Sequence, residues 1–400
     1  MKEEYLLVLN VGSSSLKYGV YDNSMITLKP LVGENIKNIG VPGSKTQNHS
    51  HAFEQMNNNI QQYADKIIGV GHRVVLGGEK FKSSVKINDD VKNAIDEMSD
   101  IAPLHNKPAL QSINKAQEIF PNAIHTAAFD TAFHQTIPQI NYTYAIPYDL
   151  SEKYGIRKFG FHGTSVRFVV ASAANMLNKN PNQCNLIVCH IGSGTSITAI
   201  KNGQSINNSM GFMPNGGPLM GTRTGDIDPM VIFYLMEKEN MSVDQAKNMI
   251  NKNSGIQGLA GTSDFYVIEQ GYKENEKAKL VWNTVTKQIA EYIASYMMLL
   301  DYKIDAIIFT GGGGENSAPL REDICNKFKN FGIRLDKKQN SVRGDTPNKI
   351  SNKNSSVQVL RIPTNEEFVI ANDTATIIKS KQPSLPVLNK ALMKRLQKVK

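Results

Sequence analysis

Two arginines stand in glycine-rich surroundings that suit them to binding small anions. Arg73 lies in the segment GHRVVLGGEKF, and Arg223 lies in the segment MGTRTGDIDP. A guanidinium group binds a planar carboxylate or a phosphoryl group through paired hydrogen bonds, and glycines let a ligand approach the backbone closely. Either side chain could instead form a surface ion pair, but the flanking glycines favour a role in anion binding.

Three further segments rich in glycine, serine or threonine follow apolar runs that are typical of buried strands. They are NVGSSS at 10–15, HIGSGT at 190–195 and TGGGGEN at 310–316. Their backbone N–H groups and hydroxyls suit phosphate oxygens. The P-loop spacing G-x-x-x-x-G-K-[ST] is absent from the sequence, as is the glycine loop of protein kinases. If the chain binds ATP, it must therefore do so with strand-turn-strand units.

Composition and charge limit the classes of protein to which the chain can belong. Its 400 residues are 40% hydrophobic and 20% charged, which is enough for two buried cores. The net charge is +9, but the lysines are spread along the chain, so we expect no nucleic-acid partner. No apolar run reaches the length of a membrane span, no signal peptide is evident, and the three cysteines lack CxxC spacing. We therefore expect a cytoplasmic protein with no membrane partner.

An internal repeat indicates two domains of like topology. The segment LLVLNVGSSS at 6–15 aligns without gaps onto LIVCHIGSGT at 186–195, with four of the ten positions identical. A second β-prone run follows each copy, so that each copy is predicted to form a strand, a tight turn and a strand. Chance similarity between two such segments is the alternative interpretation.

Periodicity and capping signals predict the surrounding elements. A long helix is expected over about 274–302, where apolar side chains recur every fourth residue. Another should start at Thr364, because Thr364 and Glu367 have the spacing of a capping box. Residues 33–50 are interpreted as a loop or irregular segment. The basic tail at 390–400 carries apolar residues at helical spacing and is predicted to dock as a terminal helix.

Seven segments, in this order, together resemble the acetate kinase family. That family shares its fold with sugar kinases, actin and the Hsp70 ATPases. The segments are NVGSSSLKY at 10–18, GHRVVLGGEKF at 71–81, FDTAFHQTIP at 129–138, FGFHGTS at 159–165, MGTRTGDIDP at 220–229, FTGGGGEN at 309–316 and IPTNEE at 362–367.

The resemblance implies an α/β fold in which two domains of duplicated ribonuclease H-like topology flank an active-site cleft. Residues 1–131 together with 367–400 would form an N-terminal domain closed by the C-terminal helix. Residues 132–366 would form a C-terminal domain for nucleotide binding and dimerisation. A homodimer is expected on the same basis.

The implied reaction is reversible, Mg²⁺-dependent phosphoryl transfer from ATP to acetate, which gives acetyl phosphate and ADP. A carboxylate is already ionised at neutral pH, so it needs no general base. It does need cations, a metal and alignment, because it must approach a polyanion. A propionate or butyrate kinase is an alternative, as is a nucleotide-switched binding protein of the same fold.

The resemblance assigns four residues to catalysis, namely Arg73, Arg223, Asp130 and His162. His162 would contact the transferring phosphoryl group, although a buried histidine at a helix start is the structural alternative. Asp130 would orient metal or substrate, although it could be a turn carboxylate. All four lie within the segments that carry the resemblance.

Asn10 and Glu366 match the metal-associated positions of the family, with Mg²⁺ as the expected ion and Mn²⁺ as an alternative. Asn10 could merely shape its turn, and Glu366 could simply favour the helix dipole. Because Glu367 has the capping-box position, we assign capping to Glu367 and the metal to Glu366.

The resemblance also places nucleotide contacts in four segments. Three positions depart from the family, because Ser193 replaces an asparagine, Tyr266 replaces a basic residue and Gly313 replaces an apolar residue. Tyr266 loses a cation and could stack on a base instead. The expected nucleotide-binding residues are Ser13, Ser15, Lys17, His190, Ile191, Gly192, Ser193, Gly194, Asp264, Phe265, Tyr266, Gly312, Gly313, Gly314, Glu315 and Asn316.

The acyl group of the substrate is expected to lie against a small apolar pocket beside Arg73. Each pocket residue is equally plausible as core, and a pocket separates acids that differ by one methylene by only about 1–3 kcal/mol. The sequence therefore leaves acetate and propionate open. The expected substrate-binding residues are Arg73, Val75, Leu104, Phe161 and Pro214.

Overall fold

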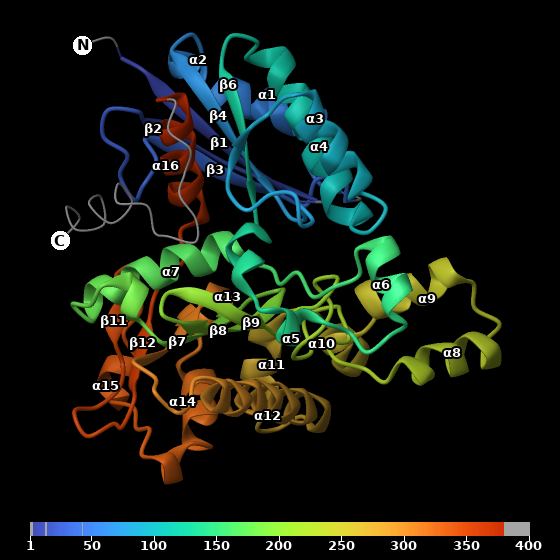
Figure 1. The fold of residues 1–400 in the computed structure, drawn as a ribbon, viewed down its shortest axis with the longest axis vertical. Helices are drawn as coiled ribbons and strands as arrows, with labels where there is room; N and C mark the ends of the chain where they lie inside the picture. The colour runs from blue at the N-terminus through green and yellow to red at the C-terminus, as the bar shows by residue number, and fades with distance from the viewer. Residues whose placement is uncertain (1–2, 13, 42, 380–400) are drawn as a thin grey trace. The chain divides into compact units, whose positions relative to one another are not determined.

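The computed structural model describes residues 3–12, 14–41 and 43–379. By its internal contacts the chain divides into two compact units. Unit 1 comprises Met1–Gln135, His162–Ala171 and Asn365–Lys400, and unit 2 comprises Thr136–Phe161 and Ser172–Thr364. Each unit is built on a six-stranded mixed sheet with helices packed against it (Figure 1).

The sheet of unit 1 has the strand order β3-β2-β1-β4-β6-β5. Strands β1, β2 and β3 form an antiparallel meander, whereas β4 is parallel to β1 and to β6. The short β5 pairs antiparallel with β6 at the edge. The strand bounds are β1 Tyr5–Gly12, β2 Ser15–Asp22, β3 Val32–Lys37, β4 Ile67–Val74, β5 Val85–Lys86 and β6 Ile124–Phe129.

The sheet of unit 2 repeats this topology. Its order is β11-β12-β10-β7-β8-β9, so β7, β8 and β9 correspond to β1, β2 and β3, and β10 and β12 correspond to β4 and β6. Strand directions agree throughout, including the antiparallel edge strand β11. The duplication expected from the repeat at 6–15 and 186–195 is therefore confirmed. The strand bounds are β7 Leu186–Ile191, β8 Thr195–Lys201, β9 Gln204–Asn208, β10 Ala306–Thr310, β11 Asn348–Lys349 and β12 Gln358–Arg361.

Helices cover both faces of the unit 1 sheet because the strands are apolar on both sides. Leu6 and Leu7 are adjacent on β1, point to opposite faces and are both fully buried. One core contains Leu7 with side chains of α1 and α4. Helix α16 packs on the other face against β1, β4 and β6. The helix bounds in this unit are α1 His49–Asn59, α2 Gln61–Ala64, α3 Asp89–Glu97, α4 Pro103–Ile119, η1 Ala132–Thr136, which runs into unit 2, and α16 Glu366–Ile378, together with the start of α7 Gly163–Met176.

In unit 2 the core lies between the sheet and the long helix α12, Glu276–Leu299. Its stripe from Val281 to Met297 is buried, which confirms the predicted long helix. The remaining helix bounds are α5 Gln139–Tyr142, α6 Tyr148–Tyr154, η2 Pro181–Gln183, α8 Pro229–Lys238, α9 Val243–Lys252, α10 Gly255–Ala260, α11 Phe265–Gly271, α13 Gly311–Asn316, α14 Ala318–Asn326, η3 Lys329–Phe331 and α15 Lys337–Asn340.

Two predictions about local structure are wrong, and a third concerns residues that the structure does not describe. Residues 33–50 are not wholly irregular, because β3 pairs along β2 as far as Lys37 and α1 begins at His49. Helix α16 starts at Glu366 rather than Thr364. The tail helix predicted within 390–400 lies beyond the described residues. Among the described helices, none has the length and apolar composition needed to cross a bilayer.

Candidate active site

Arg73 and Asp130 meet where two parallel strands of unit 1 end. Arg73 lies near the end of β4, and Asp130 directly follows β6, whose Phe129 pairs with Val74. The Arg73 Nη2 donates to Asp130 Oδ2 at 2.6 Å, and Nε lies 3.1 Å from both carboxylate oxygens. Burial alone would lower the pKa of Arg73, but Asp130 and Glu366 raise it above its usual range. The guanidinium is therefore a fixed cation.

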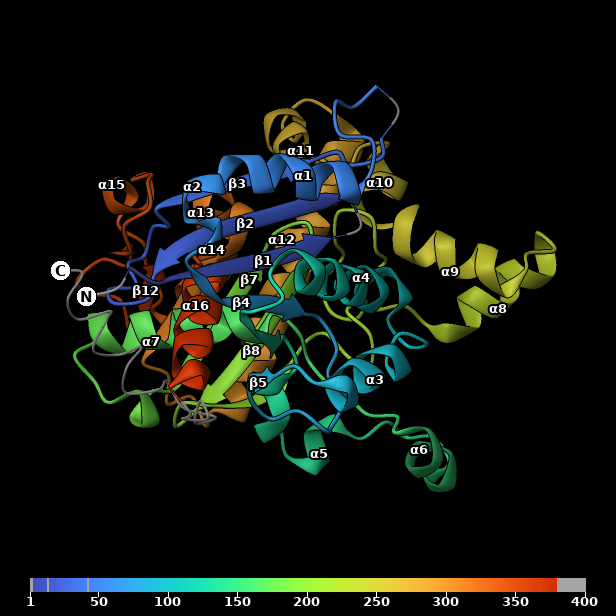
Figure 2. The same ribbon diagram turned by 90° about the horizontal axis from the view of Figure 1, so that it is seen from above.

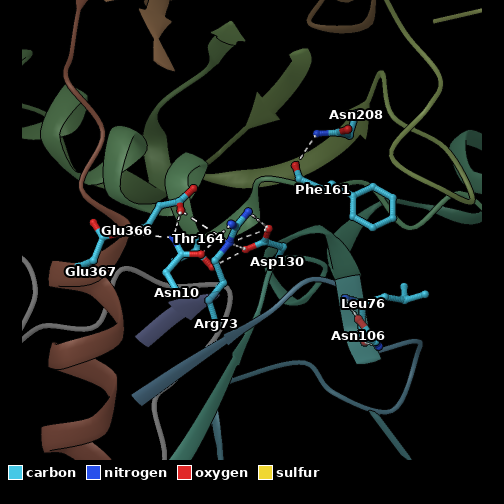
Figure 3. A network of polar contacts seen from close by, with 10 residues as sticks. All are labelled: Asn10, Arg73, Leu76, Asn106, Asp130, Phe161, Thr164, Asn208, Glu366 and Glu367. Atoms are coloured by element: carbon cyan, nitrogen blue, oxygen red, sulfur yellow. Dashed lines mark hydrogen bonds and ion pairs between the residues drawn. The ribbon is translucent and has the colours of Figure 1, made fainter. Parts of the chain in front are cut away.

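Asn10 and Glu366 complete the polar cluster around this guanidinium. Arg73 Nη1 donates to Asn10 Oδ1 at 3.1 Å, and Asn10 Nδ2 lies 3.4 Å from Glu366 Oε2. Figure 3 shows these side chains with Asp130, pointing toward one another from the ends of β1 and β4 and the start of α16. Burial raises the pKa of Glu366 to about 7, and nearby Asp130 adds to the effect against the opposing charge of Arg73.

Glu367 has a different partner from the one expected. Its carboxylate forms an ion pair with Lys17 at 2.8 Å and accepts from Asn10 Nδ2 at 3.4 Å. The cap of α16 is Asn365, whose Oδ1 accepts from Phe368 N at 3.0 Å, so the predicted capping box is wrong. Because Glu367 is tied to Lys17 instead, it belongs to the same charged cluster as Glu366.

The start of α7 is fitted closely to Asp130. Thr164 Oγ1 donates to Asp130 Oδ1 at 3.1 Å, and Gly163 N donates to its backbone oxygen at 2.9 Å. A Cβ at position 163 would lie 2.1 Å from that oxygen, so only glycine fits there. The preceding His162 has a positive φ of 59°, which is uncommon for a residue with a side chain. Backbone strain of this kind is concentrated at functional sites. The hydrogen bond between Gly163 and Asp130 also holds the backbone of His162 close to Asp130.

A buried asparagine that the sequence did not single out holds the segment after β4. Asn106 on α4 is fully buried; its Oδ1 accepts from Leu76 N at 3.2 Å and its Nδ2 donates to Leu76 O at 2.9 Å (Figure 3). Val75 is half-buried in the segment thus held. The side chain of Leu104 lies outside what the structure describes.

The other two expected acyl-pocket residues, Phe161 and Pro214, belong to unit 2. Phe161 is buried, and its backbone oxygen accepts from Asn208 Nδ2 at 3.2 Å (Figure 3). Pro214 is buried, and its backbone oxygen accepts from Arg223 Nη1 at 2.8 Å. Pro214 therefore orients the second predicted anion-binding arginine.

Arg223 is a largely buried cation in a loop of unit 2. Burial lowers its pKa. Among the described residues no carboxylate lies within ion-pair distance of it. Gly255 supports the loop, because a Cβ at its φ of 61° would lie 2.1 Å from Met220 O and 2.5 Å from Arg223 O. A desolvated guanidinium that lacks a counter-ion is suited to an incoming anion.

Nine of the nucleotide-binding residues predicted in unit 2 line a cavity of about 470 Å³. Its wall includes the β7–β8 turn, the start of α11 and the glycines of α13. Arg343, which the sequence did not single out, is the one basic residue among the described lining residues. The predicted residues on the wall are Ile191, Gly192, Ser193, Asp264, Phe265, Tyr266, Gly312, Gly313 and Asn316.

Four predicted nucleotide contacts of unit 2 are not among the described residues that line this cavity. His190 lies in strand β7, Gly194 accepts from Gly192 N in the β7–β8 turn at 3.0 Å, and Gly314 lies in helix α13. The Glu315 carboxylate accepts from Gly311 N at 2.8 Å and from Thr364 N at 3.0 Å, which ties the start of α13 to the segment before α16. In unit 1, Ser15 starts β2 and Lys17 pairs with Glu367, while Ser13 lies outside the described residues.

A family model described as the acetokinase family matches residues 5–372. The chain belongs to the acetokinase family. Acetate kinase of Clostridium novyi (strain NT) is 43% identical over 398 residues, covering 94% of this chain and 98% of that protein. Acetate kinase of Alkaliphilus metalliredigens (strain QYMF) is 42% identical over 398 residues, covering 93% and 100%.

Solved structures agree with this acetokinase assignment. Porphyromonas gingivalis acetate kinase superposes with a TM-score of 0.84 at 37% identity, covering 94% of this chain and all of that one. A propionate kinase from Francisella tularensis subsp. tularensis SCHU S4 gives 0.83 at 38% identity, covering 92% and 98%. The family and the duplicated α/β fold expected from the sequence are confirmed, and this acetokinase family member is a kinase.

Proposed function

We propose that the chain catalyses reversible phosphoryl transfer between ATP and acetate in the cytoplasm, giving acetyl phosphate and ADP. The observation that carries this proposal is Arg223, a largely buried guanidinium with no carboxylate in ion-pair range among the described residues, in a member of the acetokinase family. A reaction between two anions requires such a cation, and a protein that only binds nucleotide does not.

Different residues of the site are proposed to bind the two anions that react. Acetate is ionised at neutral pH, so no side chain has to remove a proton from it. Arg73, held by Asp130 and Asn10, is proposed to orient the acetate carboxylate. Arg223 and His162 are proposed to bind the transferring phosphoryl group, where charge develops during the reaction.

A divalent metal fits the donor set around Glu366. The cluster sets two cations, Arg73 and Lys17, against three carboxylates, those of Asp130, Glu366 and Glu367. No group of three metal-binding His, Cys, Asp or Glu residues is found in the described part of the chain, but Mg²⁺ commonly uses one or two carboxylates with waters and phosphate oxygens. We propose that Glu366 holds Mg²⁺, with Mn²⁺ as an alternative, and that Asn10 orients Glu366. When bound, the metal would neutralise charge on the nucleotide phosphates.

ATP is proposed to bind in the cavity of unit 2. A cavity of about 470 Å³ is within the range of small-molecule sites, roughly 300–1,000 Å³. Tyr266 lines this cavity and is 65% exposed, and its ring is proposed to stack on the base. Arg343 supplies a cation that Tyr266 does not.

Trapping the product with hydroxylamine tests the reaction directly. The purified chain is incubated with ATP, Mg²⁺ and acetate, and the acyl hydroxamate is measured. We expect acetate-dependent hydroxamate together with an equal amount of ADP. ADP without hydroxamate would contradict the proposal and favour a nucleotide-operated binding protein.

The choice of acid is tested with the same assay. Acetate, propionate and butyrate are compared by their kcat/KM values, because a propionate kinase is among the similar structures. We expect acetate to have the highest value. A preference for propionate or butyrate would leave the reaction class intact and reassign the substrate.

We also propose that unit 2 forms a homodimer through α8. No residue of this helix is buried, and Met230, Phe233 and Tyr234 are 64%, 56% and 58% exposed. Figure 2 shows α8 with α9 standing apart from the sheet of unit 2. A helix that is apolar all round is normally covered, and a two-fold contact would let the same helix cover its copy. Light scattering should report a dimer for the wild type and a monomer for Phe233→Glu; a dimeric variant would refute this surface.

A further inference from the structure

A buried ion pair outside the proposed substrate contacts joins two helices of unit 1. Arg167 on α7 donates from Nη1 to Asp373 Oδ2 at 2.5 Å and from Nη2 to Oδ1 at 2.9 Å, and Asp373 lies on α16. The two side chains are 6% and 1% exposed. Ser84 Oγ donates to the same carboxylate at 2.6 Å. The two parallel hydrogen bonds fix both the distance and the relative orientation of the Arg167 and Asp373 side chains.

Both helices carry groups of the candidate site at their first turns. Arg167 follows Thr164 by three residues on α7, so the two side chains lie one helical turn apart on one face. Asp373 follows Glu366 by seven residues, two turns along the same face of α16. A shift of either helix would therefore move a residue that contacts Asp130 or Arg73.

Stability alone does not account for this pair. Replacing a buried ion pair with apolar residues of similar volume is often neutral or stabilising, whereas removing one partner is costly. Arg167 Nε has no hydrogen-bond partner among the described protein atoms, and its side chain lines a cavity of about 10 Å³ with Thr164 and Ser84. That space is about the size of one water, which would link Arg167 to Thr164.

We propose that Arg167 and Asp373 are positioning residues, which hold the first turns of α7 and α16 so that Thr164 and Glu366 keep their places around Asp130 and Arg73. The proposal rests on the phosphoryl-transfer function given above. Neither residue touches substrate in this scheme. Their effect is transmitted through Glu366, so it should appear in the metal dependence and in kcat.

The double variant Arg167→Met/Asp373→Leu separates positioning from stability. It removes both buried charges and keeps an apolar contact, so we expect a melting temperature near that of the wild type. We also expect kcat to fall at least tenfold and the Mg²⁺ concentration for half-maximal rate to rise severalfold, with little change in the KM for ATP. A double variant with wild-type kcat and Mg²⁺ dependence would overturn the proposal.

Two further variants keep the test decisive if the double variant does not fold. Arg167→Lys retains the charge but loses the bidentate fork, and Ser84→Ala removes one hydrogen bond from Asp373. Both should shift the Mg²⁺ dependence in the same direction, by a smaller factor. Folded variants that leave it unchanged would count against positioning. Ile60→Ala, in a buried position of the unit 1 core, is the control; it should lower the melting temperature without altering the Mg²⁺ dependence.

A readout without turnover distinguishes failure of this inference from failure of the proposed function. Amide hydrogen exchange over residues 366–370 is measured with and without Mg²⁺, in the absence of acid and nucleotide. We expect the ion to protect this turn in the wild type and to protect it less in Arg167→Lys. Equal protection would refute positioning even if the chain made no acyl phosphate.

Discussion

Two adjacent glutamates at the start of α16 have different surroundings and therefore different expected roles. Glu366 lies beside Arg73 with its side chain 13% exposed, and this partial burial raises its pKa to about 7, whereas Glu367 is paired with Lys17. We predict that Glu366→Gln raises the Mg²⁺ requirement at least tenfold, because it removes the carboxylate that is proposed to hold the metal. The metal-free variant should melt at the same or a higher temperature, since it lacks a carboxylate whose charged form is disfavoured by partial burial.

Magnesium titrations of the initial rate, with thermal melts of the metal-free protein, check this prediction. Glu367→Gln is the matched control, because it makes the same replacement of a carboxylate by an amide at the neighbouring residue. It should disturb the Lys17 pair and shift the magnesium dependence less. A larger effect at Glu367 than at Glu366 would reverse the assignment.

Arg223 offers a sharper test of charge stabilisation. It has no carboxylate partner among the described residues, so Arg223→Ala should leave the melting temperature nearly unchanged. Turnover should fall by roughly 10²–10³, the effect of removing one donor to a developing charge. Arg223→Lys should recover little of it, because an ammonium cannot bind in the bidentate mode. Steady-state kcat measurements that show near-normal turnover for Arg223→Ala would contradict the role.

The sequence predicted residues of the site where they stand in glycine-rich or strand-end segments, as Arg73 and Arg223 do. It could not predict the residues that hold the neighbouring helices and backbone segments in place. Arg167 and Asp373 are 206 positions apart, and neither carries a local signal of its partner. Asn106 is likewise a polar residue inside a helix, and its role is evident only from the backbone of Leu76.

At the scale of elements, the placement of α16 depends on glycines of β4. A Cβ at Gly71 would lie 2.5 Å from Ile370 Cγ2 and from Thr374 Oγ1. Gly69 is close to Ile378 in the same way. Alternating glycines thus let the helix that carries Glu366 lie directly on the strand that carries Arg73.

We predict that Gly71→Ala destabilises the protein by about 1–3 kcal/mol, because the methyl group forces α16 away from β4. The same displacement should raise the Mg²⁺ requirement. Denaturant unfolding and magnesium titration check both effects. Gly312→Ala is the control for stability, since a Cβ there meets nothing within 4 Å. Equal stability of Gly71→Ala and the wild type would show that the contact relaxes at no cost.

Sequence patterns also predicted elements unevenly. Helix α12 was predictable because apolar residues recur at helical spacing over its whole length. The start of α16 was not, because Thr364 and Asn365 are both good caps and only the structure shows which side chain binds the backbone. Strand β3 was missed because Gly33, Glu34 and Asn35 are poor strand formers and pair along β2 regardless.

At the scale of the whole chain, the internal repeat predicted the duplicated topology because β1–β2 and β7–β8 keep similar turn chemistry. The other equivalent strands, such as β4 and β10, share direction and place but little sequence. The sheet order could therefore be established only from the structure. The duplicated sheet order explains why a glycine-containing turn lies at the end of β1 in unit 1 and at the end of the equivalent strand β7 in unit 2.

A buried histidine pair makes stability depend on pH. His72 on β4 and His125 on β6 lie 3.1 Å apart between Nε2 and Nδ1, and His125 Nε2 lies 3.1 Å from Phe120 O. Burial lowers the pKa of both rings, and that of His72 lies well below its usual range. At pH values well above about 6.5 the rings are neutral in the folded and unfolded states, so the pair adds no pH dependence there.

As the pH falls below about 6.5, the unfolded chain takes up protons that the folded chain resists, so the free energy of unfolding falls. The loss approaches about 1.4 kcal/mol per pH unit for each histidine that stays neutral. We predict that His72→Gln flattens this dependence between pH 7.5 and 5.5, measured by urea unfolding at each pH. His51→Gln on α1 removes a histidine outside the pair and should keep the wild-type slope. Equal losses of stability in His72→Gln and the wild type over this range would contradict the prediction. The pH dependence of the free energy of unfolding would then come from other titrating groups.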